Sequence, residues 1–452
     1  MSTTVENRYL AGNFAPVNDE LTATDLPVEG AIPKDLRGRL LRNGPNPIAP
    51  DPAAYHWFMG DGMLHAIELR DGKAVSYRNR WVRTDQALDL LGEDPIPGQP
   101  EDVFPVGSSV ANTHVVTHAG RIFALVEVCL PTQVSPDLST VGRFDFGGKL
   151  RSAMTAHPKV DPVTGEMLFF GYDPFGPPWL RYHVVNANGE LVRSEDIDIQ
   201  GPSMVHDWAI TERNVVFLDL PVVFDFDLVG KRPFPAAWKP EYGARVGVMP
   251  RDGGNADVRW FDVELCYVFH PLNAYDDNGS VVIDVVRHPK MFDTDLHGPA
   301  ELPPTLDRWT IDLDAGKVIE ERLDDRPQEF PRVDDRVIGR RHRYGYTSYV
   351  GRDDDWVQFG QLLKHDLQAG STEAHKFGPG KHASEGVFVP AADDAGEDEG
   401  WLLSVVYDEG RDASGLVVLD ATDISGSPVA TVTLPQRVPF GFHGSWIPDG
   451  AA

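Results

Sequence analysis

Short apolar runs separated by turn signals recur along most of the chain. Asn-Gly and Ala-Gly pairs stand between several of these runs, and such pairs predict β-hairpins. The predicted strands include residues 121–128, 167–170, 181–185, 281–286, 309–313, 415–419 and 430–434. Long amphipathic helices are nearly absent, and residues 86–91 and part of 221–239 are the best short candidates. The pattern therefore predicts an all-β protein.

The predicted hairpins continue from about residue 35 to residue 447 without a linker-like break. The acidic, Ala/Gly-rich segment 391–400 is expected to be a surface loop within this series. Many short strands, with 43 Gly and 37 Pro spread along the chain, fit one closed multi-sheet domain, for which a β-propeller is the natural candidate. We therefore expect a single domain over residues 1–452, in which about residues 1–34 form an N-terminal extension that packs on the propeller.

Composition narrows the range of partners. The 452 residues are 41% apolar, which is ample for a large core, and the formal net charge of −28 argues against nucleic acid and anionic membrane surfaces as main partners. No apolar run reaches the roughly 18–20 residues of a membrane span, and the first residues lack a signal peptide. We expect a cytoplasmic protein with at most peripheral membrane contact. The oligomeric state is not predicted.

The chain has only two cysteines, Cys129 and Cys266, which are too few for a disulfide framework. Both lie in apolar surroundings, so we expect buried thiols. A single disulfide between them is the alternative.

Four histidines in distinct contexts are the candidate metal ligands. They are His157 in Ala-His-Pro-Lys, His206 in Met-Val-His-Asp-Trp, His270 in Phe-His-Pro-Leu-Asn and His443 in Gly-Phe-His-Gly-Ser-Trp. No two are within helical reach, so the tertiary fold must assemble any shared site. Neutral imidazoles bind iron, copper, nickel and zinc, but four of them bring no negative charge to a divalent cation. Such a site needs carboxylates nearby.

The other histidines favour ordinary roles. His56 and His65 flank a Gly-Asp-Gly turn and are expected to be structural. Four histidines in polar stretches are expected to be exposed: His342, His365, His375 and His382. His114 and His118 lie on one predicted strand, where a spacing of four residues separates them by about 13 Å, too far to share an ion.

Eight motifs follow one another along the chain and carry a family resemblance. They are Gly-Arg-Leu-Leu-Arg-Asn-Gly-Pro-Asn-Pro at 38–47, His-Trp-Phe-Met-Gly-Asp-Gly-Met at 56–63, Ala-Asn-Thr at 111–113, Thr-Ala-His-Pro-Lys at 155–159, Cys-Tyr-Val-Phe-His-Pro-Leu-Asn-Ala-Tyr at 266–275, Gln-Glu-Phe-Pro-Arg at 328–332, Ser-Glu-Gly-Val-Phe-Val-Pro at 384–390 and Phe-Gly-Phe-His-Gly-Ser-Trp at 440–446. In this order they resemble the carotenoid cleavage oxygenase family, which includes stilbene-cleaving bacterial enzymes and retinoid isomerases.

The resemblance implies a seven-bladed β-propeller with a cap of loops and short helices over the iron-bearing face. It implies a non-haem Fe(II) on the propeller axis, bound by the four histidines above. Glu127, Glu329 and Glu385 match glutamates that accept the far-side N–H of three of these ligands. Independently of the family, a carboxylate in that place fixes the imidazole tautomer, orients the lone pair and adds the missing negative charge. The alternative is three solvated surface glutamates.

Other matching positions concern the open side of the metal. Four ligands leave two neighbouring octahedral positions for O2 and substrate. Thr113 matches a threonine whose methyl group crowds one of them, although it can equally be an ordinary strand residue. Phe58 matches an aromatic residue that contacts substrate in stilbene-cleaving relatives. The ligand-flanking residues Phe269, Phe442 and Trp446 either line the cavity or pack between blades.

The reaction implied by the resemblance is the oxidative cleavage of a conjugated carbon–carbon double bond by O2, giving two carbonyl products. The partners are then a small apolar conjugated substrate and O2, and no Gly-rich dinucleotide fingerprint is present. Two alternatives stay open: an isomerase or isomerohydrolase on the same scaffold, and a propeller that binds apolar ligands without turnover.

Departures from the stilbene-cleaving pattern bear on the substrate. These relatives carry a lysine immediately before the first glutamate, where this chain has Val126, and a cooperating tyrosine that is missing from residues 95–106. Residues 127–133 and 245–255 resemble bacterial carotenoid- and apocarotenoid-cleaving members more closely, but the segment 224–242 is short for a protein that extracts substrate from membranes. We expect Val126 to line the substrate site, and the substrate to be a short apocarotenoid or an aryl-alkene such as a stilbenoid or vinylphenol.

Overall fold

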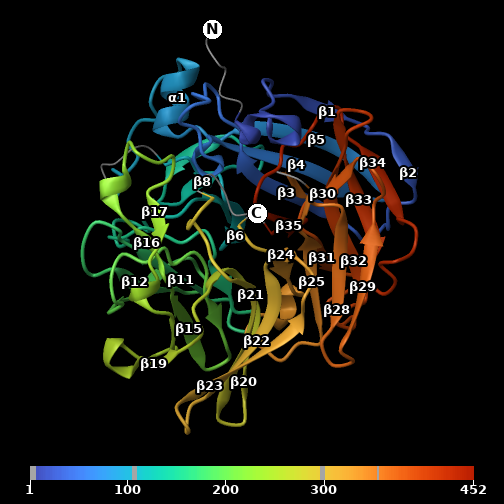
Figure 1. Ribbon diagram of the computed structural model, residues 1–452. Helices are drawn as coiled ribbons and strands as arrows, with labels where there is room; N and C mark the ends of the chain where they lie inside the picture. Colours follow the sequence, from blue (N-terminus) through green and yellow to red (C-terminus); the bar gives the residue numbers. More distant parts are fainter. Residues whose placement is uncertain (1–6, 104–108, 296–300, 354–355, 452) are drawn as a thin grey trace.

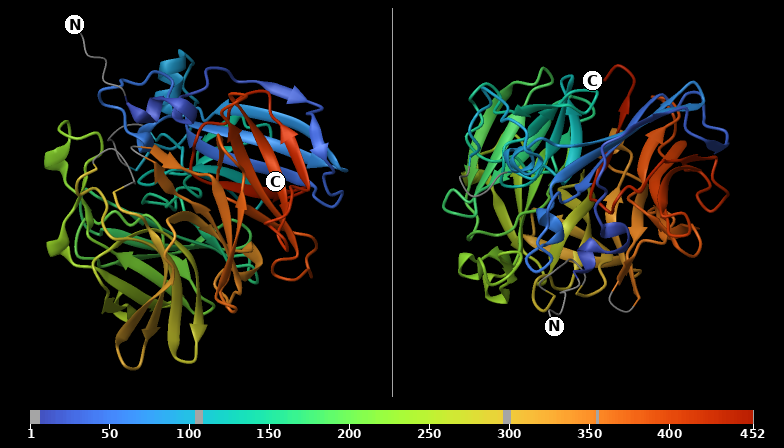
Figure 2. Two further views of the ribbon diagram at one scale, coloured as in Figure 1. Left: turned by 45° about the vertical axis from the view of Figure 1, so that its right-hand side comes forward. Right: turned by 90° about the horizontal axis from the view of Figure 1, so that it is seen from above.

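The structure is a computed structural model that describes residues 7–103, 109–295, 301–353 and 356–451. Within these residues, seven antiparallel sheets of four to six strands follow one another in a ring, in sequence order (Figures 1 and 2). The chain is a seven-bladed β-propeller, so the predicted all-β fold class is confirmed. Antiparallel blades of this kind tolerate the short strands and frequent turns seen in the sequence.

The blades are numbered around the ring, starting from the blade that contains β3, β4 and β5. Blade 1 contains β1 (Thr22–Thr24), β3 (Gly38–Pro45), β4 (Gly62–Arg70), β5 (Lys73–Trp81) and β35 (Gly444–Pro448). Blade 2 contains β6 (His114–His118), β7 (Arg121–Leu125), β8 (Thr132–Val134) and β9 (Thr140–Arg143). Blade 3 contains β10 (Lys159–Val160), β11 (Met167–Tyr172), β12 (Leu180–Val185) and β13 (Leu191–Ile197). Blade 4 contains β14 (Ala209–Ile210), β15 (Asn214–Asp219), β18 (Arg245–Pro250) and β19 (Arg259–Asp262).

The second half of the ring has the same organisation. Blade 5 contains β20 (Tyr267–Asp277), β21 (Ser280–His288), β22 (Thr305–Asp312) and β23 (Lys317–Asp324). Blade 6 contains β24 (Gln328–Arg332), β25 (Tyr344–Tyr349), β28 (Gln361–Asp366) and β29 (Ser371–Lys376). Blade 7 contains β2 (Val28–Gly30), β30 (Lys381–Ala383), β31 (Val387–Pro390), β32 (Gly400–Asp408), β33 (Ala413–Asp420) and β34 (Ala430–Thr433).

The remaining elements are short. Two hairpins stand apart from the blades: β16 (Val222–Phe224) with β17 (Ala236–Trp238), and β26 (Gly351–Asp353) with β27 (Trp356–Gln358). The helices are α1 (Asp85–Leu91), η1 (Arg8–Leu10), η2 (Gly12–Phe14), η3 (Trp57–Met59), η4 (Phe226–Leu228), η5 (Pro240–Tyr242), η6 (Asn255–Asp257) and η7 (Asp335–Val337). None of these described helices is long and apolar enough to span a membrane.

The ring is closed by the pairing of strands from opposite ends of the chain. β3 pairs antiparallel with β35, from Gly38 opposite Pro448 to Arg42 opposite Gly444. Residues near the N-terminus also add outer strands to two neighbouring blades, because β1 pairs with β5 and β2 pairs with β34. The same stretch of chain therefore contributes a strand to blade 1 and a strand to blade 7 (Figure 2).

Packing between blades explains why the strands appear as apolar runs rather than as alternating patterns. The second strand of blade 5, β21, is buried on both faces over most of its length. The largest apolar cluster lies between blades 4 and 5 and contains Val246, Ile283 and the fully buried Trp309. A strand covered by neighbouring blades on both faces has no polar side to alternate with.

Two predicted elements have different outcomes. The helix predicted at 86–91 is α1, which begins at the N-cap Thr84, whose hydroxyl accepts from Ala87 N–H, and ends at Gly92 in the left-handed conformation. The helix predicted within 221–239 is wrong, because only the three-residue η4 forms between β16 and β17. Pro233 and Pro235 lack the N–H that a continuing helix needs.

Burial corrects one expectation, and the expected free thiols are confirmed. His342, His365 and His375 are buried and His382 is half-buried, so the expected exposure is wrong. Their polar neighbours are partners inside the blades; the ring of His365, for example, bonds the hydroxyls of Thr347 and Thr372. The two cysteines are free thiols, Cys266 buried and Cys129 half-buried, which excludes the disulfide. Burial raises the pKa of each thiol to about 12.

Candidate metal centre

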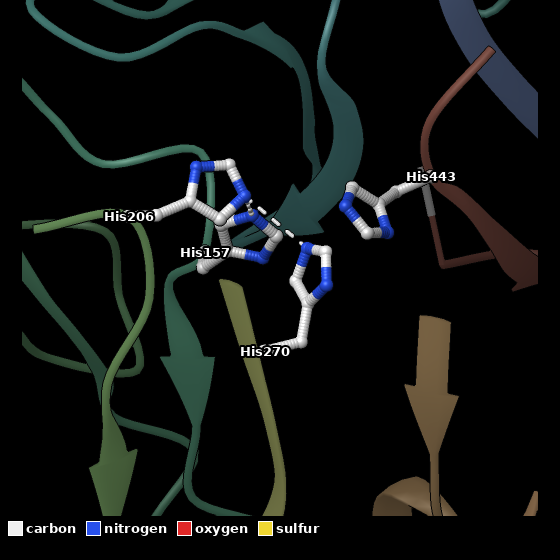
Figure 3. A group of neighbouring side chains, drawn as sticks. All are labelled: His157, His206, His270 and His443. Atoms are coloured by element: carbon white, nitrogen blue, oxygen red, sulfur yellow. Dashed lines mark hydrogen bonds between the residues drawn. The ribbon is translucent and has the colours of Figure 1, made fainter. Parts of the chain in front are cut away.

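The four candidate histidines, which the sequence separates widely, come together in the middle of the ring. One nitrogen from each of His157, His206, His270 and His443 lies within 4.8 Å of the corresponding nitrogens of the others, and all four side chains are buried (Figure 3). The Nε2 atoms of His157 and His206 are 3.1 Å apart, and those of His206 and His270 are 3.2 Å apart. Two nitrogen ligands about 2.1 Å from one ion lie about 3.0–3.4 Å apart, so these spacings fit a shared metal.

The innermost strands of four different blades position these side chains. His157 and His206 lie just before β10 and β14, His270 lies within β20, and His443 immediately precedes β35. The innermost strands are those nearest the middle of the propeller. A residue at the start of such a strand therefore points toward the same central region as its counterparts in other blades.

The three remaining blades supply the carboxylates. Glu127 follows β7 in blade 2, Glu329 lies in β24 in blade 6, and Glu385 lies between β30 and β31 in blade 7. Each of the seven blades thus contributes one histidine or one glutamate to the centre.

Each glutamate contacts the outward-facing nitrogen of one histidine. His270 Nδ1–H donates to Glu329 at 2.6 Å, and His443 Nδ1–H donates to Glu385 at 3.1 Å. His206 Nδ1 lies in close contact with Glu127. A carboxylate at Nδ1 places the proton there and leaves the Nε2 lone pair directed at the centre.

His157 is the exception among the four. Its Nδ1 is 3.8 Å from Asp207 Oδ2, which is beyond hydrogen-bond distance, and the other oxygen of Asp207 is bound by Lys159 Nζ at 2.8 Å. The backbone carbonyl of His157 accepts the indole N–H of Trp208 at 3.0 Å. His157 is thus positioned mainly through its backbone and lacks the direct carboxylate partner of the other three.

The electrostatics of His157, His443 and Glu329 favour metal-ligating forms. Burial, together with the neighbouring imidazoles, holds the pKa of His157 and of His443 well below the ordinary value, so both are neutral with a free lone pair. Burial raises the pKa of Glu329, but His270 and His288 outweigh it and lower that pKa below its usual range. Glu329 is therefore a carboxylate at neutral pH.

Three residues around the glutamates were missed by the sequence reasoning. Tyr172 donates its phenolic O–H to the oxygen of Glu127 that does not face His206. His288 Nε2 lies 2.8 Å from Glu329, and Arg332 lies 3.5 Å from Glu385. These side chains reach the glutamates only through the fold. No local motif identifies Tyr172 or His288, and Arg332 lies within a recognised motif that does not reveal its contact with Glu385.

A cavity of about 770 Å³ leads to the centre. Its wall includes seven more predicted residues beside His206, His270 and His443, and these are Phe58, Thr113, Val126, Glu127, Phe269, Glu329 and Phe442. The wall is predominantly apolar, as expected for a site that takes a hydrophobic molecule. At its outer end lie the exposed side chains of Met59, Phe226 and Val229. Trp446 does not line this cavity.

A second, more polar cavity of about 420 Å³ reaches the same histidines along the innermost strands. His157 and His270 line it together with Lys159, Asp207 and Trp446. The centre is thus approached from an apolar side and from a polar side.

Comparisons with known proteins agree with this architecture. The family model described as "Retinal pigment epithelial membrane protein" matches residues 14–448. The chain is 44% identical over 495 aligned positions to the "Carotenoid cleavage oxygenase" of Mycobacterium tuberculosis (strain ATCC 25618 / H37Rv), with 98% of each chain covered. It is 33% identical over 472 positions to the "Isoeugenol monooxygenase" of Pseudomonas nitroreducens, covering 97% of this chain and 98% of that one. The crystal structure of Pseudomonas brassicacearum lignostilbene dioxygenase superposes with a TM-score of 0.89 at 31% identity, covering 98% and 99% of the two chains.

Proposed function

Because this chain belongs to the carotenoid cleavage oxygenase family and is an alkene-cleaving dioxygenase, we propose that it cleaves a conjugated double bond with O2 at one Fe(II) ion. The ligands proposed for this ion are His157, His206, His270 and His443. The observation that carries the proposal is the convergence of these four imidazoles at the inner end of an apolar cavity. The products are two carbonyl compounds.

The donor set fits iron. Neutral imidazole nitrogens suit Fe(II), and the proposed outer partners Glu127, Glu329 and Glu385 bring the negative charge that the ligands lack. Bound Fe(II) would supply the electron density that activates O2. The carboxylates themselves hold a proton on Nδ1 of each partner histidine, which keeps Nε2 available as a ligand atom.

The cavity wall performs the rest of the proposed task. Phe58, Phe269 and Phe442 present aromatic rings beside the histidines, and their role is to position a flat conjugated molecule and to exclude water. Thr113 donates its hydroxyl to Asn112 at 3.0 Å, so its methyl group is the part left to face the cavity. We propose that this methyl group crowds one side of the metal.

The substrate proposed is a short apocarotenoid or an aryl-alkene. Val126 makes its part of the wall apolar, where a lysine would bind a phenolic oxygen in stilbene-cleaving relatives. The names of two relatives, a carotenoid cleavage oxygenase and an isoeugenol monooxygenase, support this pair of substrate classes.

The test combines metal analysis with isotope labelling. Protein purified without added zinc is expected to bind close to one iron per chain and to incorporate labelled oxygen from O2 into aldehyde products, measured by mass spectrometry. His270→Ala is expected to lose both iron and activity, whereas His382→Ala, a half-buried histidine in blade 7, keeps both. Full iron content and full turnover in His270→Ala would overturn the ligand assignment.

A further inference from the structure

One charged side chain in the cavity wall has no partner among the residues that the structure describes. Arg232 is half-buried and lines the cavity, and its guanidinium forms no hydrogen bond or ion pair within the part of the chain that the structure describes. The two other charged residues in the wall, Glu127 and Glu329, are already engaged by histidines. Arg232 is therefore the wall's one available charge among the described residues.

Asp225, an acidic group close enough to feel the charge of Arg232, does not bind this guanidinium. Its carboxylate is bound by Lys239 Nζ at 3.1 Å. The backbone of Arg232 is anchored, since its N–H donates to Leu228 C=O at 3.0 Å and Pro233 follows it. A half-buried cation on an anchored backbone, with no partner among the described residues, favours a ligand that supplies the missing acceptor.

The position of Arg232 defines which ligand that is. Its neighbours Phe226 and Val229 are exposed at the outer end of the cavity, whereas the histidines line the inner end. A ligand that reaches from Arg232 to the histidines must be polar at its outer end and apolar along the rest. A carboxylate matches the planar fork of a guanidinium, because two parallel N–H groups can bind its two oxygens.

We propose that Arg232 is a specificity-determining residue for conjugated substrates that carry a carboxylate at the end remote from the cleaved bond. This inference rests on the proposed function, since it concerns the same cavity. It adds the class of head group, which the apolar lining and Val126 leave unspecified.

The test measures binding separately from turnover. Iron-loaded protein is kept free of O2, so that nothing is cleaved, and is titrated with all-trans-retinoate and with all-trans-retinol, which share one conjugated skeleton. Dissociation constants are read from protein fluorescence quenching. Arg232→Met is expected to weaken retinoate binding about tenfold, because a charge-assisted hydrogen bond is lost, and to leave retinol binding within about twofold. Lys231→Met, a change at the exposed neighbour that does not line the cavity, is expected to alter neither.

The outcomes separate this inference from the proposed function. Equal effects of Arg232→Met on both ligands, no effect on either, or no binding of either ligand to the unaltered protein would overturn the role of Arg232. If the retinoate preference is lost only in Arg232→Met, the inference holds, even if admission of O2 then yields no aldehyde from any conjugated alkene. That last result would instead refute the proposed cleavage activity.

Discussion

Glu127 is contacted from two directions. One of its oxygens faces His206, and the other receives the phenolic proton of Tyr172. Burial, reinforced by Glu127, holds the pKa of Tyr172 well above its ordinary value, so the phenol remains a donor at any working pH. Glu127 thus has its orientation fixed at both ends.

Replacing Tyr172 by Phe removes this donor and keeps the ring. We expect turnover or iron retention to fall about 3- to 10-fold, because loss of an outer partner loosens the ligand it orients. The matched control is Tyr182→Phe in the same blade, whose hydroxyl donates to Arg251 C=O, remote from the centre. A Tyr172→Phe protein with the iron affinity and kinetics of Tyr182→Phe would contradict the positioning role.

Glu329→Gln tests the negative charge itself. The glutamate accepts from His270 and His288, and a neutral amide in its place removes the charge and one acceptor. We expect iron affinity to fall about 10- to 100-fold while the fold is retained, measured by chelator competition and circular dichroism. Glu321→Gln, on the exposed side of β23, serves as the charge-matched control. Unchanged affinity would remove Glu329 from the centre.

For single residues, the local sequence context supported much of the prediction. The contexts of His157 and Glu385 identify them within the chain, although nothing local shows that they meet. Tyr172 and His288 lie in ordinary strand sequence, and their contacts depend on which blades face each other. Arg232 could not be singled out from the sequence either, because only the folded loop shows that it has no partner among the described residues.

The strand that brings in His443 is fitted closely against its neighbour. Gly441 and Gly44 pack backbone to backbone; a Cβ on Gly441 would lie 2.6 Å from Asn43 C=O and 2.7 Å from Gly44 Cα. Neither contact is a side chain that can turn away. The absence of a side chain at Gly441 therefore sets the path of the segment that leads to His443.

Gly441→Ala is expected to displace this segment. The clash should lower the melting temperature by about 1–3 °C, since overpacking costs about 1–3 kcal/mol, and should reduce iron retention with it. The control is Gly360→Ala, where a Cβ would meet nothing within 4 Å. Calorimetry with metal analysis decides the matter: iron retention equal to that of Gly360→Ala would show that the close approach is unimportant for the centre.

Elements with clear start, stop or turn signals in the sequence were predictable. α1 lies between a threonine cap and a glycine stop, and the hairpins follow their Asn-Gly and Ala-Gly turns. The structure of segment 221–239 was not predictable, because its apolar residues line the cavity and do not form one face of a helix. Phe224 and Phe234 both line the cavity from β16 and from the stretch before β17.

Buried histidines in three blades couple the stability of the whole molecule to pH. Burial lowers the pKa of His65 and of His183 to about 3, and that of His365 to about 4, from an ordinary value of 6.5. The unfolded chain therefore binds more protons than the folded one below pH 6.5. Stability from these groups is fully present above that pH and is lost as the pH falls toward 3–4.

We expect each such histidine to cost about 1.4 kcal/mol of unfolding free energy at pH 5.5 relative to neutral pH. In His183→Gln, the unfolding free energy measured by urea titration should depend less steeply on pH between pH 7 and 5.5. The slope should correspond to the uptake of up to one proton fewer on unfolding. Asn188→Gln, an exposed and uncharged position in the turn between β12 and β13, should keep the original slope. Identical slopes in the two variants would refute the coupling.

On the scale of the whole molecule, the architecture followed from the regular series of short strands, and the number of blades followed from the family resemblance. The sequence did not reveal which blades contribute a histidine to the centre and which contribute a glutamate. Six of the seven residues lie in or beside the innermost strand of their blade, whereas Glu127 follows β7, the second strand of blade 2.

The pairing of β3 with β35 has a consequence for biosynthesis. Translation proceeds from the N-terminus, so blades 2 to 6 emerge from the ribosome complete, whereas blade 1 waits for residues 444–448. His443 lies directly before that last strand and is held by Glu385 once Gly444 has docked. The nascent chain therefore presents at most three of these four imidazoles until residues 443–448 have emerged, so the four-histidine group is assembled only when the ring closes.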